Sequence, residues 1–400
     1  MPLSDDILKR VTFLVGSSDT VSRIGDVTGI EPFGEEVTEF LNDVSRELLK
    51  SPAAKGYPDV VTFGFWLRKA SVNKLKERFV TDGRIRLGKG VVFHIAPSNV
   101  PVNFAYSLAA GLMTGNANVV RVPSKDFPQV RIITDALSSV LERYEELKPY
   151  VICVRYGRDS EINDAFSSVC DMRVVWGGDN TIAELRKSPL PPRSGEITFA
   201  DRYSLAVIDS DSYMSAEDKD RIAQDFYNDT YLTDQNACTS PMIVVWTGSR
   251  ISDSQEIFWG RLHTLVKEKY EFKPIQAVNK LTKSYLASCA LDTGKISHED
   301  NLLVRVEVNE LTEKVIGYRD NSGFFFEYAC SDIRELIPIC NDKRCQTIGY
   351  IGDSSVFMPL IASKVKGIDR IVPVGRTMDF DLIWDGYDLP SVLTRTIAVE

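Results

Sequence analysis

Short apolar runs alternate with helical segments from about residue 90 onward. The runs are nearly continuous, as expected for strands that a parallel sheet buries on both faces. Strands that alternate with helices predict βαβ units. The predicted strands of a first set cover residues 91–96, 118–122, 150–155, 172–176 and 205–208, and the helices between them cover 101–114, 128–146, 160–168 and 179–187.

A second set of the same kind follows, and a helical stretch precedes both. Residues 1–80 are predicted to be helical, because apolar side chains recur at helical spacing over 35–50 and 59–79. The second set is predicted as helix 216–230, strand 242–246, helix 253–269, strands 302–308 and 324–328, helix 332–338 and strand 347–351. The pattern predicts an α/β fold with two Rossmann-like, parallel-sheet lobes. The expected divisions are a helical segment 1–84 packed on the first lobe, a first lobe 85–204, a second lobe 205–375 and a C-terminal segment 376–400.

Composition narrows the class of protein. Hydrophobic residues make up 44% and charged residues 26%, which is typical of globular proteins. The formal net charge is −9 and no long basic stretch occurs, so nucleic acid is not an expected partner. The polar N-terminus, MPLSDDILKR, does not resemble a signal peptide, and no apolar run predicts a membrane span. The seven cysteines lack metal spacing, so we expect reduced thiols, a cytoplasmic protein and no metal site.

Two loops that follow predicted strands carry polar groups able to bind a ligand, since open α/β sheets bind ligands where strands end at their carboxyl side. The amide of Asn99 can donate a hydrogen bond to a developing oxyanion. It can equally cap the helix that follows. Arg121 and Ser124 fit the ribose or phosphate of a nucleotide, or an ordinary solvated exit from a strand.

A third loop, WGGDNT at residues 176–181, contains Gly177 and Gly178 between a strand and a helix. Glycines there allow a diphosphate to approach the start of the helix closely. The alternative is a tight turn that needs a positive φ. The G-x-G-x-x-G and G-x-x-x-x-G-K-[ST] fingerprints are absent, which disfavours a standard dinucleotide site and a P-loop.

Cys238 is the candidate nucleophile. It lies in a polar loop, DQNACTSP at residues 234–241, between a helix and an apolar strand. Thiolates attack carbonyls and thioesters readily, although Cys238 could also be one of several inert thiols. The three histidines have no partner at metal spacing, and we expect His94 to be packed in the core.

The order of these motifs resembles the aldehyde dehydrogenase superfamily. Asn99, residues 121–124, Gly177-Gly178 and Cys238 follow one another as they do there. Three segments are more specifically similar to the LuxC-type acyl-CoA reductases: GVVFHIAPSNVP at 90–101, CQTIGYIG at 345–352 and RIVPVGRTMDFDLIWDGYDL at 370–389. The resemblance covers roughly residues 85–390.

The resemblance implies a role for each matching position. It makes 85–204 a nicotinamide cofactor-binding lobe and 205–375 a catalytic lobe. Cys238 would carry the acyl group, and the Asn99 amide together with the Cys238 backbone N–H would form an oxyanion hole. The cofactor's adenosine ribose would face Arg121 and Ser124, and its diphosphate would lie near Gly177 and Gly178.

One position departs from the acid-forming members of the superfamily. Those members carry a glutamate in a Glu-Leu-Gly-Gly-Lys segment, whereas residues 198–202 read TFADR here, with Thr198 at the glutamate position. Hydrolysis of a thioester needs a base to activate water, so the change favours reduction. Glu196 is close in sequence but lies outside the aligned position.

An acyl-CoA reductase is therefore the activity that the resemblance implies, converting a fatty acyl thioester to an aldehyde with NADPH, or NADH, as cofactor. It also implies an acyl-CoA or acyl-enzyme substrate, an acyl-protein synthetase as partner, no membrane partner and a homo-oligomer. The alternatives are an NAD-dependent aldehyde dehydrogenase, an acyl-phosphate reductase of the same fold, and a non-catalytic subunit that retains the fold.

Overall fold

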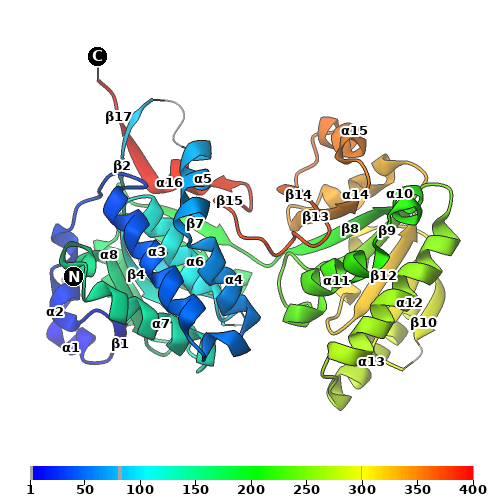
Figure 1. The fold of residues 1–400 in the computed structure, drawn as a ribbon, viewed down its shortest axis with the longest axis horizontal. Helices are drawn as coiled ribbons and strands as arrows, with labels where there is room; N and C mark the ends of the chain where they lie inside the picture. Colours follow the sequence, from blue (N-terminus) through cyan, green and yellow to red (C-terminus); the bar gives the residue numbers. More distant parts are fainter. Residues whose placement is uncertain (1–2, 80–82, 99, 299, 400) are drawn as a thin grey trace. The chain divides into compact units, whose positions relative to one another are not determined.

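The structure is a computed structural model that describes residues 3–79, 83–98, 100–298 and 300–399 (Figure 1). The chain divides into two compact units. Unit 1 comprises Met1–Ala200 together with Asp381–Glu400, and unit 2 comprises Asp201–Phe380.

The sheet of unit 1 has the strand order β1-β5-β4-β3-β6-β7. Its strands run parallel except β1, which is antiparallel to β5. Phe93 of β3 contacts Phe166 of α8, while the next residue, His94, reaches Ser107 of α6. Because neighbouring residues of a strand point to opposite faces, helices cover both faces, which explains the continuous apolar runs. The strands are β1 (Thr12–Val15), β3 (Val91–Ile95), β4 (Ala117–Arg121), β5 (Val151–Arg155), β6 (Met172–Trp176) and β7 (Gly195–Phe199).

The helices of unit 1 come mostly from the first half of the chain (Figure 1). They are α1 (Asp5–Leu8), α2 (Ser18–Ser22), α3 (Glu35–Lys50), α4 (Pro58–Trp66), α5 (Lys69–Phe79), α6 (Asn103–Met113), α7 (Pro128–Leu141), α8 (Ser160–Val169), α9 (Asp179–Leu185) and α16 (Leu389–Leu393). Two small antiparallel pairs complete the unit: β2 (Ile85–Gly88) with β17 (Thr394–Ile397), and β15 (Ile383–Trp384) with β16 (Tyr387–Asp388).

The divisions of the chain differ from the expected ones in three places. The N-terminal segment is not helical throughout, because β1 adds an edge strand to the sheet. The C-terminal residues 381–400 form part of unit 1, because β17 pairs with β2 and α16 packs beside α6. The units divide after Ala200 rather than after residue 204, because β8 (Tyr203–Asp209) belongs to the second sheet.

The sheet of unit 2 has the strand order β10-β11-β12-β9-β8-β13-β14, with only the edge strand β10 antiparallel to its neighbour. Besides β8, its strands are β9 (Pro241–Thr247), β10 (Thr293–His298), β11 (Val304–Val308), β12 (Phe324–Ala329), β13 (Cys345–Ile351) and β14 (Arg370–Pro373). Its helices are α10 (Ser210–Ser215), α11 (Lys219–Asp229), α12 (Ile251–Lys269), α13 (Pro274–Ala290), α14 (Ile337–Cys340) and α15 (Met358–Ala362).

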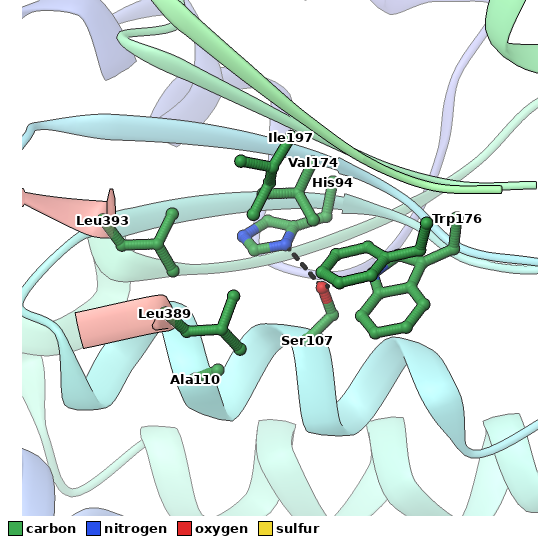
Figure 2. Close-up of a pocket in the computed structure, with 9 residues that line it drawn as sticks. His94, Ser107, Ala110, Val174, Trp176, Ile197, Leu389 and Leu393 are labelled. Atoms are coloured by element: carbon green, nitrogen blue, oxygen red, sulfur yellow. Dashed lines mark hydrogen bonds between the residues drawn. The ribbon is translucent and has the colours of Figure 1, made fainter. Parts of the chain in front are cut away.

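A buried polar chain joins strands and helix in the core of unit 1. His94 is 1% exposed, and its Nε2 donates to Asn118 Oδ1 at 3.0 Å. Its Nδ1 then accepts from the Ser107 hydroxyl at 2.7 Å, and that oxygen accepts from Trp176 Nε1 at 3.0 Å. Figure 2 shows this contact beside a cavity of about 10 Å³, with α16 side chains on its other side. The expected structural role of His94 is confirmed, because both ring nitrogens are used.

Acid should destabilise the protein through His94. Burial lowers the pKa of His94 to about 4, whereas an unfolded histidine titrates near 6.5. From about pH 6.5 down to about 4 the unfolded chain binds a proton that the folded protein does not, so the unfolding free energy should fall by about 3 kcal/mol. Urea unfolding of wild type and His94→Gln should show a flatter pH dependence for the variant in this range. Equal slopes would contradict the assignment.

Candidate active site

The loops predicted to bind a ligand in unit 1 lie at the carboxyl ends of its parallel strands. β3 lies between β4 and β6 in the sheet. The chain passes from β3 to β4 on one side, and it later returns to the other side of β3 as β6. The switch point of the sheet is therefore at β3 and β6, where ligands of such sheets bind. The residues after β3 and the Gly177-Gly178 pair after β6 both lie at these carboxyl ends. Asn99 lies outside the described residues, so its role stays a prediction.

The two glycines do not serve a turn that requires glycine. Gly178 has φ −68° and caps the start of α9, and Gly177 is not among the glycines with positive φ. A Cβ atom built on Gly178 would meet no atom within 4 Å. The tight-turn alternative is thus wrong, and Gly178 leaves open space beside the helix start.

Arg121 and Ser124 follow the neighbouring strand, β4. The Arg121 guanidinium donates to the Gly157 carbonyl at 3.0 Å and lies over the ring of Tyr156, 4.6 Å from its centroid. Ser124 is exposed. The structure therefore holds Arg121 against β5's exit loop, and a contact of either residue with a ribose stays a prediction.

Cys238 differs from most other cysteines in its exposure. It is half-buried in unit 2, whereas Cys289 is exposed and the other five thiols are buried. Burial raises the pKa of Cys153, Cys170 and Cys330 to about 12. These three thiols are therefore protonated near neutral pH, which leaves them poorly nucleophilic.

The loop before Cys238 is held by one buried amide. Gln235 is fully buried, and its Nε2 donates to the carbonyls of Pro241 and Phe324 at 3.1 and 3.3 Å. Its Oε1 accepts from the backbone N–H groups of Gly323 and Phe324 at 2.6 and 3.2 Å. Gln235 thus ties the loop to the first residues of β9 and β12. Sequence reasoning missed it, because one glutamine in a polar loop has no periodic signal.

Three further side chains, two from α13 and Tyr270 at the end of α12, hold the loop and its neighbour. Gln276 Nε2 donates to the Asp234 carboxylate at 3.3 Å, and Tyr270 also donates to that carboxylate. The buried Lys280 donates to the carbonyls of Asn301 and Ser322, next to the Gly323 that binds Gln235. Burial lowers the pKa of Lys280 to about 8. The start of α13 is therefore hydrogen-bonded to the loop that carries Cys238.

The chain segment after β14 is held beside the same loop. The fully buried Asp229, at the end of α11, accepts from the backbone N–H groups of Gly375 and Thr377 at 2.6 and 3.1 Å. Burial raises the pKa of Asp229 to about 7. The Thr239 hydroxyl, next to Cys238, donates to Met378 Sδ at 3.1 Å. The segment that carried the specific resemblance thus packs against the residue after the candidate nucleophile.

Comparisons with known proteins decide the family. Residues 73–292, more than half of the chain, match the family described as Acyl-CoA reductase (LuxC).

The chain belongs to the LuxC family.

Named relatives of this LuxC-family chain are reductases of acyl-protein thioesters. It is 24% identical to the long-chain acyl-protein thioester reductase of Aliivibrio fischeri, over 72% of this chain and 58% of that protein. It is 22% identical to the long-chain acyl-protein thioester reductase 2 of Photobacterium leiognathi, over 76% of this chain and 64% of that protein. The chain therefore spans about three fifths of the length of these relatives.

Solved structures show that the LuxC-family chain has the aldehyde dehydrogenase fold. Aldehyde dehydrogenase 21 from Physcomitrella patens superposes with a TM-score of 0.63 at 13% identity, covering 95% of this chain and 88% of that one. An NAD-dependent benzaldehyde dehydrogenase from Corynebacterium glutamicum superposes with a TM-score of 0.60 at 15% identity, covering 92% and 85%. The expected fold class is confirmed.

Glu196, two residues before Thr198, forms two ion pairs. Its carboxylate pairs with Arg173, which is 2% exposed, at 2.6 Å and with Arg186 at 2.8 Å. The Glu196 carboxylate is thus tied to two arginine side chains of unit 1. Thr198 lies two residues further along β7.

A larger cavity of unit 2 lies away from Cys238. Its volume is about 310 Å³, and α11 and the carboxyl ends of β13 and β14 line it. Cys238 precedes β9, which runs parallel to both strands in the same sheet. The cavity thus lies at the carboxyl ends of the strands, whereas Cys238 lies at the amino end of β9.

The described part of the chain shows neither a cluster of metal-binding side chains nor a membrane-spanning helix. Residues of the His, Cys, Asp and Glu types form no group of three or more there that could hold a metal ion. None of the helices described is both long and apolar enough to cross a bilayer.

Replacing Gln235 should loosen the Cys238 loop. Gln235→Met leaves buried carbonyl and N–H groups without partners, so the unfolding free energy should fall by about 2–4 kcal/mol. The exposed Asn236→Ala, in the same loop, should cost less than about 1 kcal/mol. Chemical denaturation measures both. A Gln235→Met protein as stable as Asn236→Ala would refute the role given to this amide.

Thiol labelling should distinguish Cys238 from the buried cysteines. In a Cys289→Ser background, a small alkylating reagent should modify one thiol of the folded protein, because accessibility and thiolate character control the rate. Mass spectrometry of digested protein should place the label on Cys238. Fast labelling of a buried cysteine, or none at Cys238, would argue against a reactive nucleophile.

Proposed function

We propose that this LuxC-family chain is an oxidoreductase that reduces a long-chain acyl thioester to an aldehyde through an acyl group carried on Cys238. The observation that carries the proposal is the half-buried Cys238 thiol in a loop that Gln235 hydrogen-bonds to two strands. The family match, which includes Cys238, and the names of the relatives support it.

The first step needs only groups of this chain and the substrate. The Cys238 thiolate attacks the thioester carbonyl carbon, a new C–S bond forms, and the donor thiolate leaves with the electrons of the broken C–S bond. Covalent catalysis of this kind divides one difficult step into two easier ones. A loop held by buried hydrogen bonds keeps the sulfur in one place, which favours attack. Asn99 and the Cys238 backbone N–H are the proposed donors to the oxyanion.

Unit 1 is the proposed cofactor unit. A reduced nicotinamide supplies the hydride that turns an acyl thioester into an aldehyde. The residues present fit such a group, because Gly178 leaves open space at the start of α9 and lies at the switch-point edge of the sheet. The diphosphate would lie against Gly177 and Gly178, and the ribose would lie near Arg121 and Ser124. We propose NADPH as the cofactor, with NADH as the alternative.

Aldehyde formation is favoured over acid formation. Release of an acid would need a base to activate water against the acyl-Cys238 thioester. Thr198 stands at the position of that base, and Glu196 is paired with Arg173 and Arg186. An aldehyde dehydrogenase that makes acids is therefore the weaker proposal.

Purified protein should convert acyl-CoA and NADPH, or NADH, to aldehyde. A panel of chain lengths should show turnover that rises with chain length, because about 0.8 kcal/mol is gained for each buried methylene. Cys238→Ala should abolish turnover, and Asn99→Ala should lower the rate about 10²–10³-fold. Gas chromatography of aldehyde and acid measures both products. Aldehyde from Cys238→Ala at the wild-type rate would refute the mechanism, and fatty acid as the main product would favour the alternative.

A further inference from the structure

The sheet of unit 2 has a switch point of its own. The chain adds β9 to β12 on one side of β8, and it then returns to the other side of β8 as β13. Open α/β sheets bind ligands outside the carboxyl ends of their strands at such a point. The cavity of about 310 Å³ lies beside it, because the carboxyl ends of β13 and β14 line the cavity together with α11. This cavity is therefore a second candidate site, at the end of the strands away from Cys238.

The walls of the cavity are mostly apolar. The apolar and aromatic side chains that line it are Ile222 of α11, Tyr350 and Ile351 of β13, Pro373 of β14 and the Val374 that follows. The ring of Tyr350 is held by an edge contact with Phe357, with the ring centroids 5.9 Å apart. Ligand pockets of this size are lined mainly by such side chains, and a few polar groups orient the ligand. The walls therefore suit a small organic molecule with an apolar body.

Among the described residues that line the cavity, Asp225 alone carries a full charge near neutral pH. It is partly buried on α11, and burial raises the pKa of its carboxyl above the usual value. Its ion-pair partner is Arg221, whose Nε lies 3.8 Å from Asp225 Oδ2 and whose side chain is 78% exposed. Such a long, exposed ion pair contributes little. Because a carboxylate accepts several hydrogen bonds, Asp225 keeps acceptors for a cationic ligand.

Charges beside the cavity also favour a positive ligand. Asp209 ends β8, the strand next to β13, and Asp353 follows Gly352 of the lining. On the side of β14, Arg376 is paired with Asp379 at 2.9 Å. Carboxylates at the rim of a cleft with low-dielectric walls attract cations and repel anions. The cavity therefore discriminates by the sign of the ligand's charge as well as by its size.

We propose that this cavity binds a small organic cation, a primary amine with an apolar body. The ammonium group donates to the Asp225 carboxylate, and the body lies against Ile222, Tyr350 and Val374. An aromatic ring beside a carboxylate is a combination that recognises organic cations. The site goes beyond the reduction proposed for Cys238, because amine binding needs neither a thioester nor a nicotinamide.

Calorimetric titration near neutral pH with three indole compounds of similar size tests the ligand class. Tryptamine carries an ammonium group, tryptophol a hydroxyl group and indole-3-acetate a carboxylate. Wild type should bind tryptamine with a dissociation constant of about 1 mM or below, as expected for a ligand of this size. Tryptophol should bind at least about tenfold more weakly, because it lacks the charged hydrogen bond to Asp225. Indole-3-acetate should bind more weakly still, because its charge has the same sign as that of Asp225.

Two variants of α11 locate the site. Asp225→Asn keeps the shape of the side chain and removes its charge, so tryptamine should bind at least about tenfold more weakly. Its affinity for tryptophol should stay within about twofold of wild type, since an uncharged ligand loses no ion pair. Asp220→Asn is the matched control, because Asp220 lies on the same helix, is 80% exposed and is not part of the lining. It should bind all three compounds as wild type does, and thermal unfolding verifies that both variants fold.

Three results would overturn the amine site. They are no binding of tryptamine to wild type, equal affinity for tryptamine and indole-3-acetate, and tryptamine binding that Asp225→Asn leaves unchanged. The last would place the bound amine elsewhere on the protein. None of these results bears on acyl transfer to Cys238, which is measured without an amine.

Discussion

The backbone before Cys238 adopts a conformation that needs an external restraint. Asp234 and Gln235 have φ values of 54° and 51°, in the left-handed region that residues other than glycine rarely adopt. Such residues cost about 1–3 kcal/mol each and persist where the surroundings over-determine them. Here the surroundings are the amide of Gln235, which uses its donors and its acceptor on β9 and β12, and the Asp234 carboxylate, which accepts from α13.

Other hydrogen bonds of unit 2 support the same loop before Cys238. β9 and β12 are neighbours in the sheet, so a loop bonded to both has its position set by the sheet itself. Lys280 fixes the Ser322 carbonyl, and Asp229 fixes the segment whose Met378 receives the Thr239 hydroxyl. A half-buried thiol in such a rigid setting suits covalent catalysis, in which a small displacement of the attacking atom is costly.

The elements predicted correctly from the sequence are those whose burial leaves a regular pattern of apolar residues. The central strands of both sheets appear as apolar runs because helices cover both of their faces, and Cys238 and the glycine pair stand out through their motifs. Residues 274–290 received no prediction, because α13 inverts the usual rule by exposing Ile275 and Tyr285 and burying Lys280. Gln235 and Asp229 could not be found either, since a buried, satisfied polar residue looks like a surface residue in a sequence. The pairing of Glu196 with two arginines likewise depends on long-range geometry.

Acyl transfer to Cys238 is tested most directly by the mass of the protein after mixing with palmitoyl-CoA in the absence of any nicotinamide. Wild type and Cys289→Ser should each gain one palmitoyl group, located on Cys238 and absent from Cys238→Ala. The group should persist, because Thr198 supplies no base for hydrolysis and Glu196 is paired with two arginines. An acyl group on another residue, or rapid release of palmitic acid with no acylated protein, would contradict acyl transfer to Cys238.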